Sequence, residues 1–252
     1  MNATDLTGKA AIVFGGTAGI GLATVRLLIE RGARVLAAGL NSSDARVALA
    51  GVGDEASLLW REVDVRDEAA VSGAVAAAAE AFGRVDIAIN NAGVESSFGP
   101  VQDAQQDEFD KLMGINLRGI WLGLKYEIPH MLAHGGGAIV NTSSQAGVAG
   151  IANVALYTAS KHAVVGLTRA VALENAIHNI RVNAVAPGPV DTGLLHRMVD
   201  GHIPVSVIAD SVPMKRVSQP AEIAEAIVWL ASDAASYVTG HVLVADGGIT
   251  AA

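Results

Sequence analysis

Apolar runs of strand length alternate with longer helical patterns along the whole of this 252-residue chain. The runs are continuously apolar, which is typical of parallel strands buried on both faces by helices. Parallel strands are joined by crossover connections, and nearly all of these are right-handed. The pattern therefore predicts one α/β domain, spanning residues 1–252, with a single doubly wound parallel sheet.

The individual elements can be placed from the same periodicity. Seven strands are expected, at 9–14, 34–38, within 58–65, and at 85–90, 138–141, 180–185 and 241–244. Helices are expected at 20–30, 68–82, 109–133, 154–176 and 221–231. Residues 187–220 have five prolines and weak periodicity, so we expect a functional loop there, with a substrate lid at 190–213. The predicted architecture is a seven-stranded, Rossmann-type domain with helices on both faces.

Composition excludes several classes of protein. There is no cysteine, which rules out disulfides, thiolate nucleophiles and Cys-ligated metals, and we expect no catalytic metal. The formal net charge of −8 argues against a nucleic-acid partner. Polar residues and glycines interrupt the longest uncharged stretch, 128–160, so it does not resemble a membrane span. The first residues lack the pattern of a signal peptide, and we expect a cytoplasmic protein without a membrane partner.

A glycine-rich turn directly follows the first predicted strand. Its residues, Gly15-Gly16-Thr17-Ala18-Gly19-Ile20-Gly21, open the first predicted helix. A strand, a glycine turn and a helix N-terminus together place backbone N–H groups where they can hold a phosphate. Gly-rich turns are also common without a ligand, but this one opens the first βαβ unit. The position favours a dinucleotide site.

A tyrosine and a lysine lie one helical turn apart. Tyr157 and Lys161 share one face of the predicted helix, and Ser144 precedes Tyr157 by 13 residues. A phenol has a pKa near 10, and a nearby ammonium group lowers it. Tyr157 could then take a proton from an alcohol or give one to a ketone. A single helical tyrosine is more often a packing residue, but the joint spacing with Ser144 favours a catalytic site.

Over essentially its whole length the chain resembles the short-chain dehydrogenase/reductase family. The family's T-G-x-x-x-G-I-G turn matches Gly15, Gly19 and Gly21, with Phe14 in place of the usual threonine. Its N-N-A-G motif matches Asn90 to Gly93. Asp64-Val65 matches the pair that contacts the cofactor's adenine in this family, and Tyr157 and Lys161 match its Y-x-x-x-K motif. Pro187-Gly188, followed by Val190 and Thr192, matches the family's segment beside the nicotinamide.

The resemblance implies hydride transfer between a nicotinamide dinucleotide and a ketone or secondary alcohol. In this family Tyr157 would be the acid–base group, Lys161 would also hold the nicotinamide ribose, and Ser144 would polarise the substrate oxygen. Asn116 would kink its helix through a bound water and complete a proton relay. The cofactor would contact Gly15, Thr17, Gly19, Ile20, Gly21, Gly39, Asp64, Val65, Asn91, Ala92, Gly93, Tyr157, Lys161, Pro187, Gly188, Val190 and Thr192.

The choice between NAD(H) and NADP(H) depends on the end of the second predicted strand. Gly39-Leu40 supplies neither the carboxylate that binds a ribose 2′-hydroxyl nor a cation for a 2′-phosphate. Ala18 in the turn is likewise neutral. Asn41, Ser42 and Ser43 could hydrogen-bond ribose or phosphate, or simply cap the next helix. The lack of a cation favours NAD(H), as does an ending, 244–251, that resembles NAD-linked secondary-alcohol members.

The expected substrate is a small apolar carbonyl compound or alcohol. The segments expected around its pocket offer apolar side chains, namely Phe98, Val148, Ile151, Leu194, Leu195, Met198, Val207 and Ile208. Gln145, His196 and His202 are possible polar contacts, although a histidine in a lid is more often a solvated surface residue. A 3-oxoacyl carrier-protein reductase is an alternative, although its acidic carrier would need cations at the pocket mouth. A non-catalytic dinucleotide-binding regulator and a lyase or epimerase are further alternatives. Family members are usually homotetramers, and we expect the same here.

Overall fold

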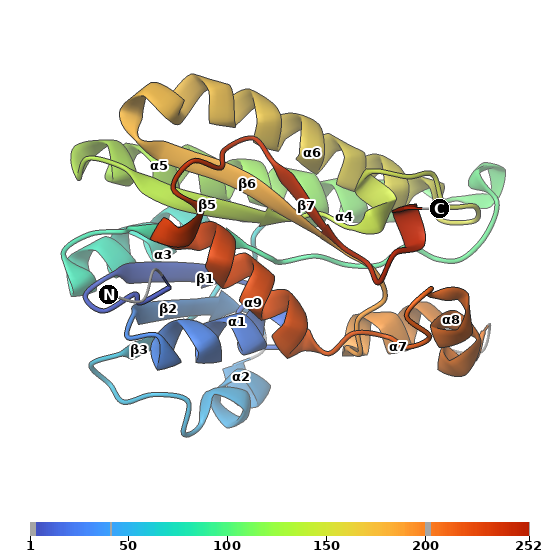
Figure 1. Ribbon diagram of the computed structural model, residues 1–252, viewed down its shortest axis with the longest axis horizontal. Helices are drawn as coiled ribbons and strands as arrows, with labels where there is room; N and C mark the ends of the chain where they lie inside the picture. The colour runs from blue at the N-terminus through green and yellow to red at the C-terminus, as the bar shows by residue number, and fades with distance from the viewer. Residues whose placement is uncertain (1–3, 41, 200–202, 252) are drawn as a thin grey trace.

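Seven parallel strands form one sheet in this computed structural model, which describes residues 4–40, 42–199 and 203–251 (Figure 1). The strands are β1 (Ala10–Phe14), β2 (Arg34–Gly39), β3 (Leu58–Glu62), β4 (Ile87–Asn90), β5 (Gly137–Thr142), β6 (Ile180–Pro187) and β7 (Val242–Ala245). Their order in the sheet is β3-β2-β1-β4-β5-β6-β7. This confirms the predicted doubly wound sheet. The order reverses between β1 and β4, which is where such sheets bind ligands, at the carboxyl ends of the strands.

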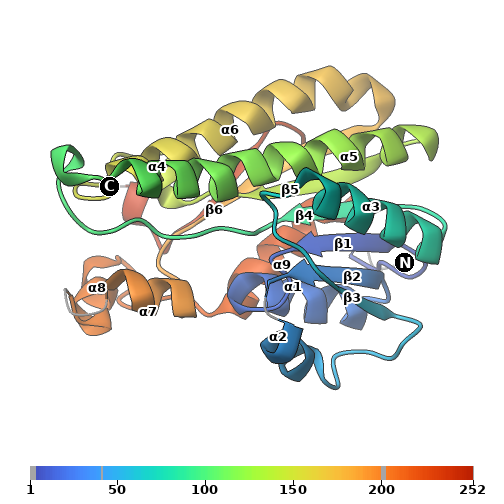
Figure 2. The ribbon, with the colours of Figure 1, turned by 180° about the vertical axis from the view of Figure 1, so that it is seen from behind.

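Helices cover both faces of the sheet (Figure 1 and Figure 2). The α-helices are α1 (Gly19–Glu30), α2 (Ser42–Leu49), α3 (Glu68–Phe82), α4 (Gln106–Leu112), α5 (Gly119–Ala133), α6 (Ala155–Asn175), α7 (Gly193–Val199), α8 (Val205–Ser211) and α9 (Pro220–Ala231). One face carries α1 and α9, and the other carries α3, α5 and α6. Among the described helices, none combines the length and apolar character needed to traverse a bilayer.

Each face of the sheet has its own apolar core. Ile12, Leu36 and Ile139 point toward α3, α5 and α6, whereas Val13 and Ile89 point toward α1 and α9. Successive side chains of a strand point to opposite faces, so a strand buried on both sides is apolar at most positions, and the polar exceptions are hydrogen-bonded asparagines such as Asn90 and Asn141. This is why the strands read as continuous apolar runs in the sequence.

The structure differs from the sequence expectations in two regions. A short helix, α2, follows β2 where no helix range was predicted, because too few of its apolar side chains are buried to produce a helical period: Ala45 and Leu49 are buried, whereas Val47 is exposed. The segment 187–220 is not one loop. It holds α7 and α8, which stand beyond the carboxyl ends of the strands and apart from the helices that cover the sheet (Figure 1 and Figure 2).

Candidate active site

A cavity of about 620 Å³ lies at the carboxyl ends of the strands. It extends from the turn after β1, past the segments that follow β4 and β5, to Tyr157 on α6 and the inner side of α7. Segments far apart in the sequence meet here because parallel strands all end at the same edge of the sheet. The cavity therefore joins the predicted phosphate turn to the predicted catalytic helix.

The glycine turn has the shape that a phosphate site requires. Gly15 and Gly19 have φ angles of +76° and +50°, a region that favours glycine. A Cβ atom on Gly21 would lie 1.9 Å from the carbonyl oxygen of Gly15, so only glycine fits there. The N-cap of α1, Ala18, provides no side-chain acceptor, which leaves the first N–H groups of the helix available to an anion.

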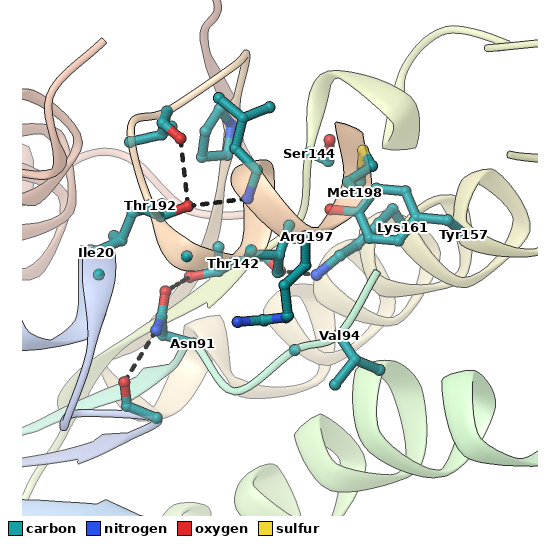
Figure 3. A pocket seen from close by; sticks show the side chains of 18 of the residues that line it. Ile20, Asn91, Val94, Thr142, Ser144, Tyr157, Lys161, Thr192, Arg197 and Met198 are labelled. Atoms are coloured by element: carbon teal, nitrogen blue, oxygen red, sulfur yellow. Dashed lines mark hydrogen bonds between the residues drawn. The ribbon is translucent and has the colours of Figure 1, made fainter. Parts of the chain in front are cut away.

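Asn91 holds this turn from the neighbouring strand. Its Nδ2 donates to the Gly15 carbonyl at 3.2 Å, and its Oδ1 accepts from the hydroxyl of Thr142 at 3.2 Å (Figure 3). Phe14, the departure from the family pattern, is buried in the core between the sheet and α3. The backbone N–H of Gly15 donates to Ala38 at 2.8 Å, so the turn is fixed without a hydroxyl at position 14.

Tyr157 and Lys161 come together on α6, as their spacing predicted (Figure 3). The Lys161 Nζ lies 5.7 Å from the centre of the Tyr157 ring and donates to the Thr142 carbonyl at 2.9 Å. Burial lowers the pKa of Lys161 to about 8. Burial also raises the pKa of Tyr157, which opposes the effect expected from the ammonium group, while a hydrogen bond with Ser144 lowers that pKa. Ser144 therefore touches the group expected to transfer the proton.

Asn116 does not line the cavity; it lies behind the cavity wall, fully buried. The long predicted helix 109–133 contains a π-helical turn at Met113–Arg118, which separates α4 from α5 and carries Asn116. The Asn116 side chain pairs with both backbone groups of Val94, at 2.8 and 3.0 Å, and donates to Ser160 at 3.2 Å. Asn116 thus fixes the segment that follows the N-N-A-G motif.

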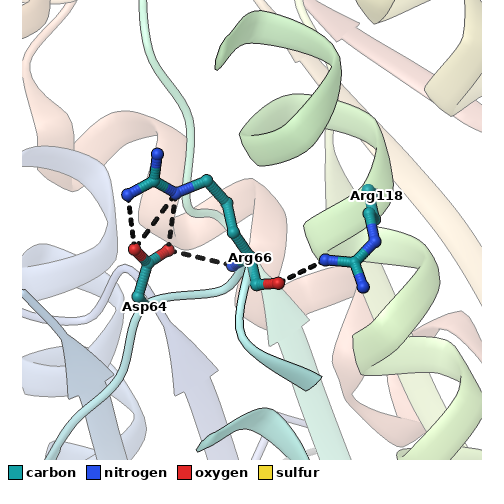
Figure 4. A network of polar contacts seen from close by, with 3 residues as sticks. All are labelled: Asp64, Arg66 and Arg118. Atoms are coloured by element: carbon teal, nitrogen blue, oxygen red, sulfur yellow. Dashed lines mark hydrogen bonds and ion pairs between the residues drawn. The ribbon is translucent and has the colours of Figure 1, made fainter. Parts of the chain in front are cut away.

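The end of the cavity toward β2 and β3 has neutral walls. Gly39, Leu40 and Thr17 line it, and a Cβ atom on Gly39 would lie 2.6 Å from the Thr17 hydroxyl. The one carboxylate on the described lining, Asp64, is chelated by Arg66 at 2.6 to 3.0 Å, and Arg118 holds the Arg66 carbonyl (Figure 4). This arrangement leaves Asp64 with little free negative charge toward the cavity.

Most predicted site residues lie on this one cavity. Of the predicted catalytic and cofactor residues, all but Asn116 and Gly21 line it. Six of the eight candidate apolar residues do so too, together with Gln145; the six are Phe98, Ile151, Leu194, Leu195, Met198 and Ile208.

Three of the candidate substrate contacts do not line the cavity, and for His196 this matches the expected surface position of a lid histidine. His196 turns away from the cavity and bonds to Asp191 at 2.8 Å, and Val148 and Val207 are exposed to solvent outside the lining. His202 and Asn41 lie outside the described residues, as does the side chain of Ser42. A helix surface that alternates polar and apolar residues does not reveal which side faces a cavity.

One pair of residues at the cavity was not predicted. Arg197, on α7, lines the cavity and forms a bidentate ion pair with Glu95, at 2.7 and 3.2 Å. Glu95 lies directly after Val94, and its negative charge raises the pKa of Tyr157. Nothing in the sequence relates two residues 102 positions apart.

Comparison with known proteins gives a consistent family. A family model described as enoyl-(acyl carrier protein) reductase matches residues 15–250. The 2,5-dichloro-2,5-cyclohexadiene-1,4-diol dehydrogenase of Sphingobium indicum is 44% identical over 250 residues, which are 98% of this chain and 99% of that protein. The cis-4-hydroxycyclohexanecarboxylate dehydrogenase of Sinomonas cyclohexanicum is 42% identical, with 96% and 97% covered. The crystal structure of levodione reductase superposes with a TM-score of 0.93 at 37% identity, covering 98% of this chain and 99% of that one.

Proposed function

This chain belongs to the short-chain dehydrogenase/reductase family, and from that premise we propose that it interconverts a cyclic secondary alcohol and its ketone with NAD(H). It is a nicotinamide-dependent oxidoreductase of alcohols and ketones. The observation that carries the proposal is one cavity with a glycine phosphate turn at one end and Tyr157, Lys161 and Ser144 at the other.

The residues around the cavity fit a dinucleotide. The uncapped N-terminus of α1 would hold the pyrophosphate, and the segments at Ala92-Gly93 and Pro187-Gly188 would lie along the nicotinamide side. A Cβ atom on Gly188 would lie 2.7 Å from the Asp246 backbone, so the backbone segments at Gly188 and Asp246 pack closely against each other and give the cofactor site a fixed wall. When bound, the dinucleotide accepts or supplies the hydride.

The proton is handled by side chains of this chain. Tyr157 would take the proton of the alcohol at its phenolic oxygen, or return one to the ketone oxygen. Ser144, which is hydrogen-bonded to Tyr157, would donate to the same substrate oxygen and fix its position. Lys161 would supply the positive charge that favours the phenolate and would hold the ribose. Asn116 would complete the relay from its place beside Val94.

The proposal of a ring substrate has two supports. The lining beyond Tyr157 is largely apolar, with Phe98, Ile151, Leu194 and Met198, which suits a compact hydrocarbon frame. Two relatives, at 44% and 42% identity, are named for their action on a cyclohexadiene diol and a hydroxycyclohexane. We expect NAD(H) over NADP(H) because no cation lies on the described lining near Gly39 and Leu40.

We propose further that residues 190–213, with α7 and α8, act as the substrate lid of one catalytic domain. We also expect a homotetramer in the cytoplasm. Large apolar side chains stand exposed on α5 (Trp121 and Leu132), near the end of α6 (Leu173) and in the turn that follows it (Ile177), and such side chains suit subunit contacts.

A kinetic experiment tests the proposed reaction. Oxidation of NADH and NADPH is followed at the reduced-nicotinamide absorbance band with cyclic and open-chain ketones, for the wild type and Tyr157→Phe. We expect turnover of cyclic ketones with NADH and a fall of at least about 100-fold in Tyr157→Phe, the usual size of a general-acid contribution. Absence of turnover with any ketone would refute the reaction, and unchanged turnover in Tyr157→Phe would refute the role of the phenol.

A further inference from the structure

Arg197 is the one charged side chain on the described lining that lies near the substrate end without being placed in the proton transfer. The charged residues of the lining are Asp64, Lys161 and Arg197. Asp64 is chelated by Arg66 at the adenine end, and Lys161 is bound to the Thr142 carbonyl. Arg197 reaches from α7 into the cavity that holds Tyr157 (Figure 3). A charged group in an apolar pocket is expected to orient a polar group of the ligand.

The guanidinium of Arg197 has one donor nitrogen to spare. Its Nε and Nη2 donate to Glu95, and among the described residues Nη1 has no hydrogen-bond partner. Gly193 makes room for this nitrogen, because a Cβ atom at that position would lie 3.3 Å from Nη1. The guanidinium group is therefore fixed by Glu95 at Nε and Nη2, and its Nη1 is available to donate to a ligand.

Glu95 fixes both the position and the net charge of the pair. It follows Val94, whose backbone is held by both polar atoms of Asn116, so the carboxylate is anchored to the body of the domain. Its side chain is only 19% exposed, against 62% for Arg197. Because the carboxylate neutralises the guanidinium, the pair offers a hydrogen-bond donor with little net positive charge. Such a donor favours a neutral oxygen over a carboxylate.

We infer, and this rests on the proposed function, that Arg197 selects ring substrates that carry a second, neutral oxygen. Its Nη1 donates to a hydroxyl or carbonyl oxygen on a ring carbon other than the one that reacts. The substrates would be diols, hydroxy ketones or diketones of ring compounds. An acidic substrate would have to compete with Glu95 for the same guanidinium and would be disfavoured.

The test compares three ring ketones that differ in the second group: cyclohexanone, 1,4-cyclohexanedione and 4-oxocyclohexanecarboxylate. The kcat/KM for NADH-dependent reduction is measured for the wild type, Arg197→Gln, Arg197→Lys and Glu95→Gln. The matched control is Arg216→Gln, which breaks a bidentate Arg–Glu pair at 2.6 and 2.7 Å that does not line the cavity.

We expect the wild type to prefer the diketone to cyclohexanone. That preference should fall about 10-fold in Arg197→Gln, the lower end for a hydrogen bond to a charged donor that is partly exposed, and less in Arg197→Lys. Arg216→Gln should leave the preference unchanged. In Glu95→Gln the unpaired guanidinium should raise activity toward the carboxylate about 10-fold, since a full positive charge then faces it.

Several results would overturn the inference. These are a wild type that prefers the carboxylate, an equal loss for both neutral ketones in Arg197→Gln, or a preference that does not change. Turnover of open-chain ketones but of no ring ketone would overturn the ring substrate of the proposed function, and this inference with it. A wild type that reduces cyclohexanone and the diketone equally would overturn this inference alone.

Discussion

Glu127 gives the sharpest quantitative prediction, because it is an acid sealed in the core. It lies on α5 and is fully buried between that helix and the sheet. Asn90 donates to its Oε2 at 3.1 Å, and Asn90 in turn bonds to Asn141 at 3.0 Å. Among the described residues, Oε1 of Glu127 and Oδ1 of Asn90 have no partner. Both border the space above Gly123, where a Cβ atom would lie 3.0 and 2.4 Å from them.

Burial raises the pKa of Glu127 from 4.5 to about 8. A carboxylate whose Oε1 has no donor in the described part of the chain is poorly solvated there, so the neutral acid suits the site better than the carboxylate. The unfolded chain releases this proton near pH 4.5, while the folded protein keeps it to about pH 8. The stability contributed by Glu127 is therefore fully present below pH 4.5 and is lost as the pH rises toward 8.

Substitution Glu127→Gln keeps the shape and removes the titration. Between the unfolded pKa of 4.5 and the folded pKa of about 8, binding of one proton changes the free energy of unfolding by about 1.4 kcal/mol per pH unit. From pH 5 to pH 7 the free energy of unfolding of the wild type should therefore fall by about 3 kcal/mol relative to that of Glu127→Gln. The free energy of unfolding is measured by urea titration at pH 5, 6, 7 and 8. Glu80→Gln, at an exposed position on α3, is the control and should show no such trend. A difference between Glu127→Gln and the wild type that stays constant with pH would refute the reasoning.

Three further predictions concern the site. Gly21→Ala should weaken NADH binding at least about 10-fold in a fluorescence titration, because its Cβ atom would lie 1.9 Å from the Gly15 carbonyl; unchanged affinity would contradict the packing. Asn116→Ala should lower the unfolding free energy by about 2 kcal/mol, since both backbone groups of the partly buried Val94 lose a partner, and a thermal melt within a degree of the wild type would contradict this. Lys161→Met should abolish turnover yet raise the unfolding free energy at pH 7. Burial lowers the pKa of this lysine from 10.5 to about 8, which costs the charged form about 3 kcal/mol, and loss of its hydrogen bond to the Thr142 carbonyl offsets about 1 kcal/mol of the gain. The expected net gain is about 2 kcal/mol, and a loss in urea titration would contradict this.

The sequence by itself determined the features that depend on neighbours along the chain. Apolar runs located the inner strands, because a strand covered on both faces has few polar positions, whereas the edge strand β3 is apolar only in its first half and ends on the exposed Arg61 and Glu62. The glycines of the first turn and the four-residue spacing of Tyr157 and Lys161 are also local. A single turn or helix decides their geometry, and Gly15, Gly19, Tyr157 and Lys161 lie on the cavity as predicted, whereas Gly21 only supports the turn from behind it.

Only the tertiary structure decided the contacts between distant segments. Arg197 is paired with Glu95 across 102 residues, and Glu127 is buried against Asn90 from another element. His196 turns away from the cavity that Arg197 lines, although the two are adjacent on α7. Side chains one position apart on a helix point about 100° from each other, and the packing of α7 against the domain selects which of them faces inward. That choice is made by contacts that no local pattern records.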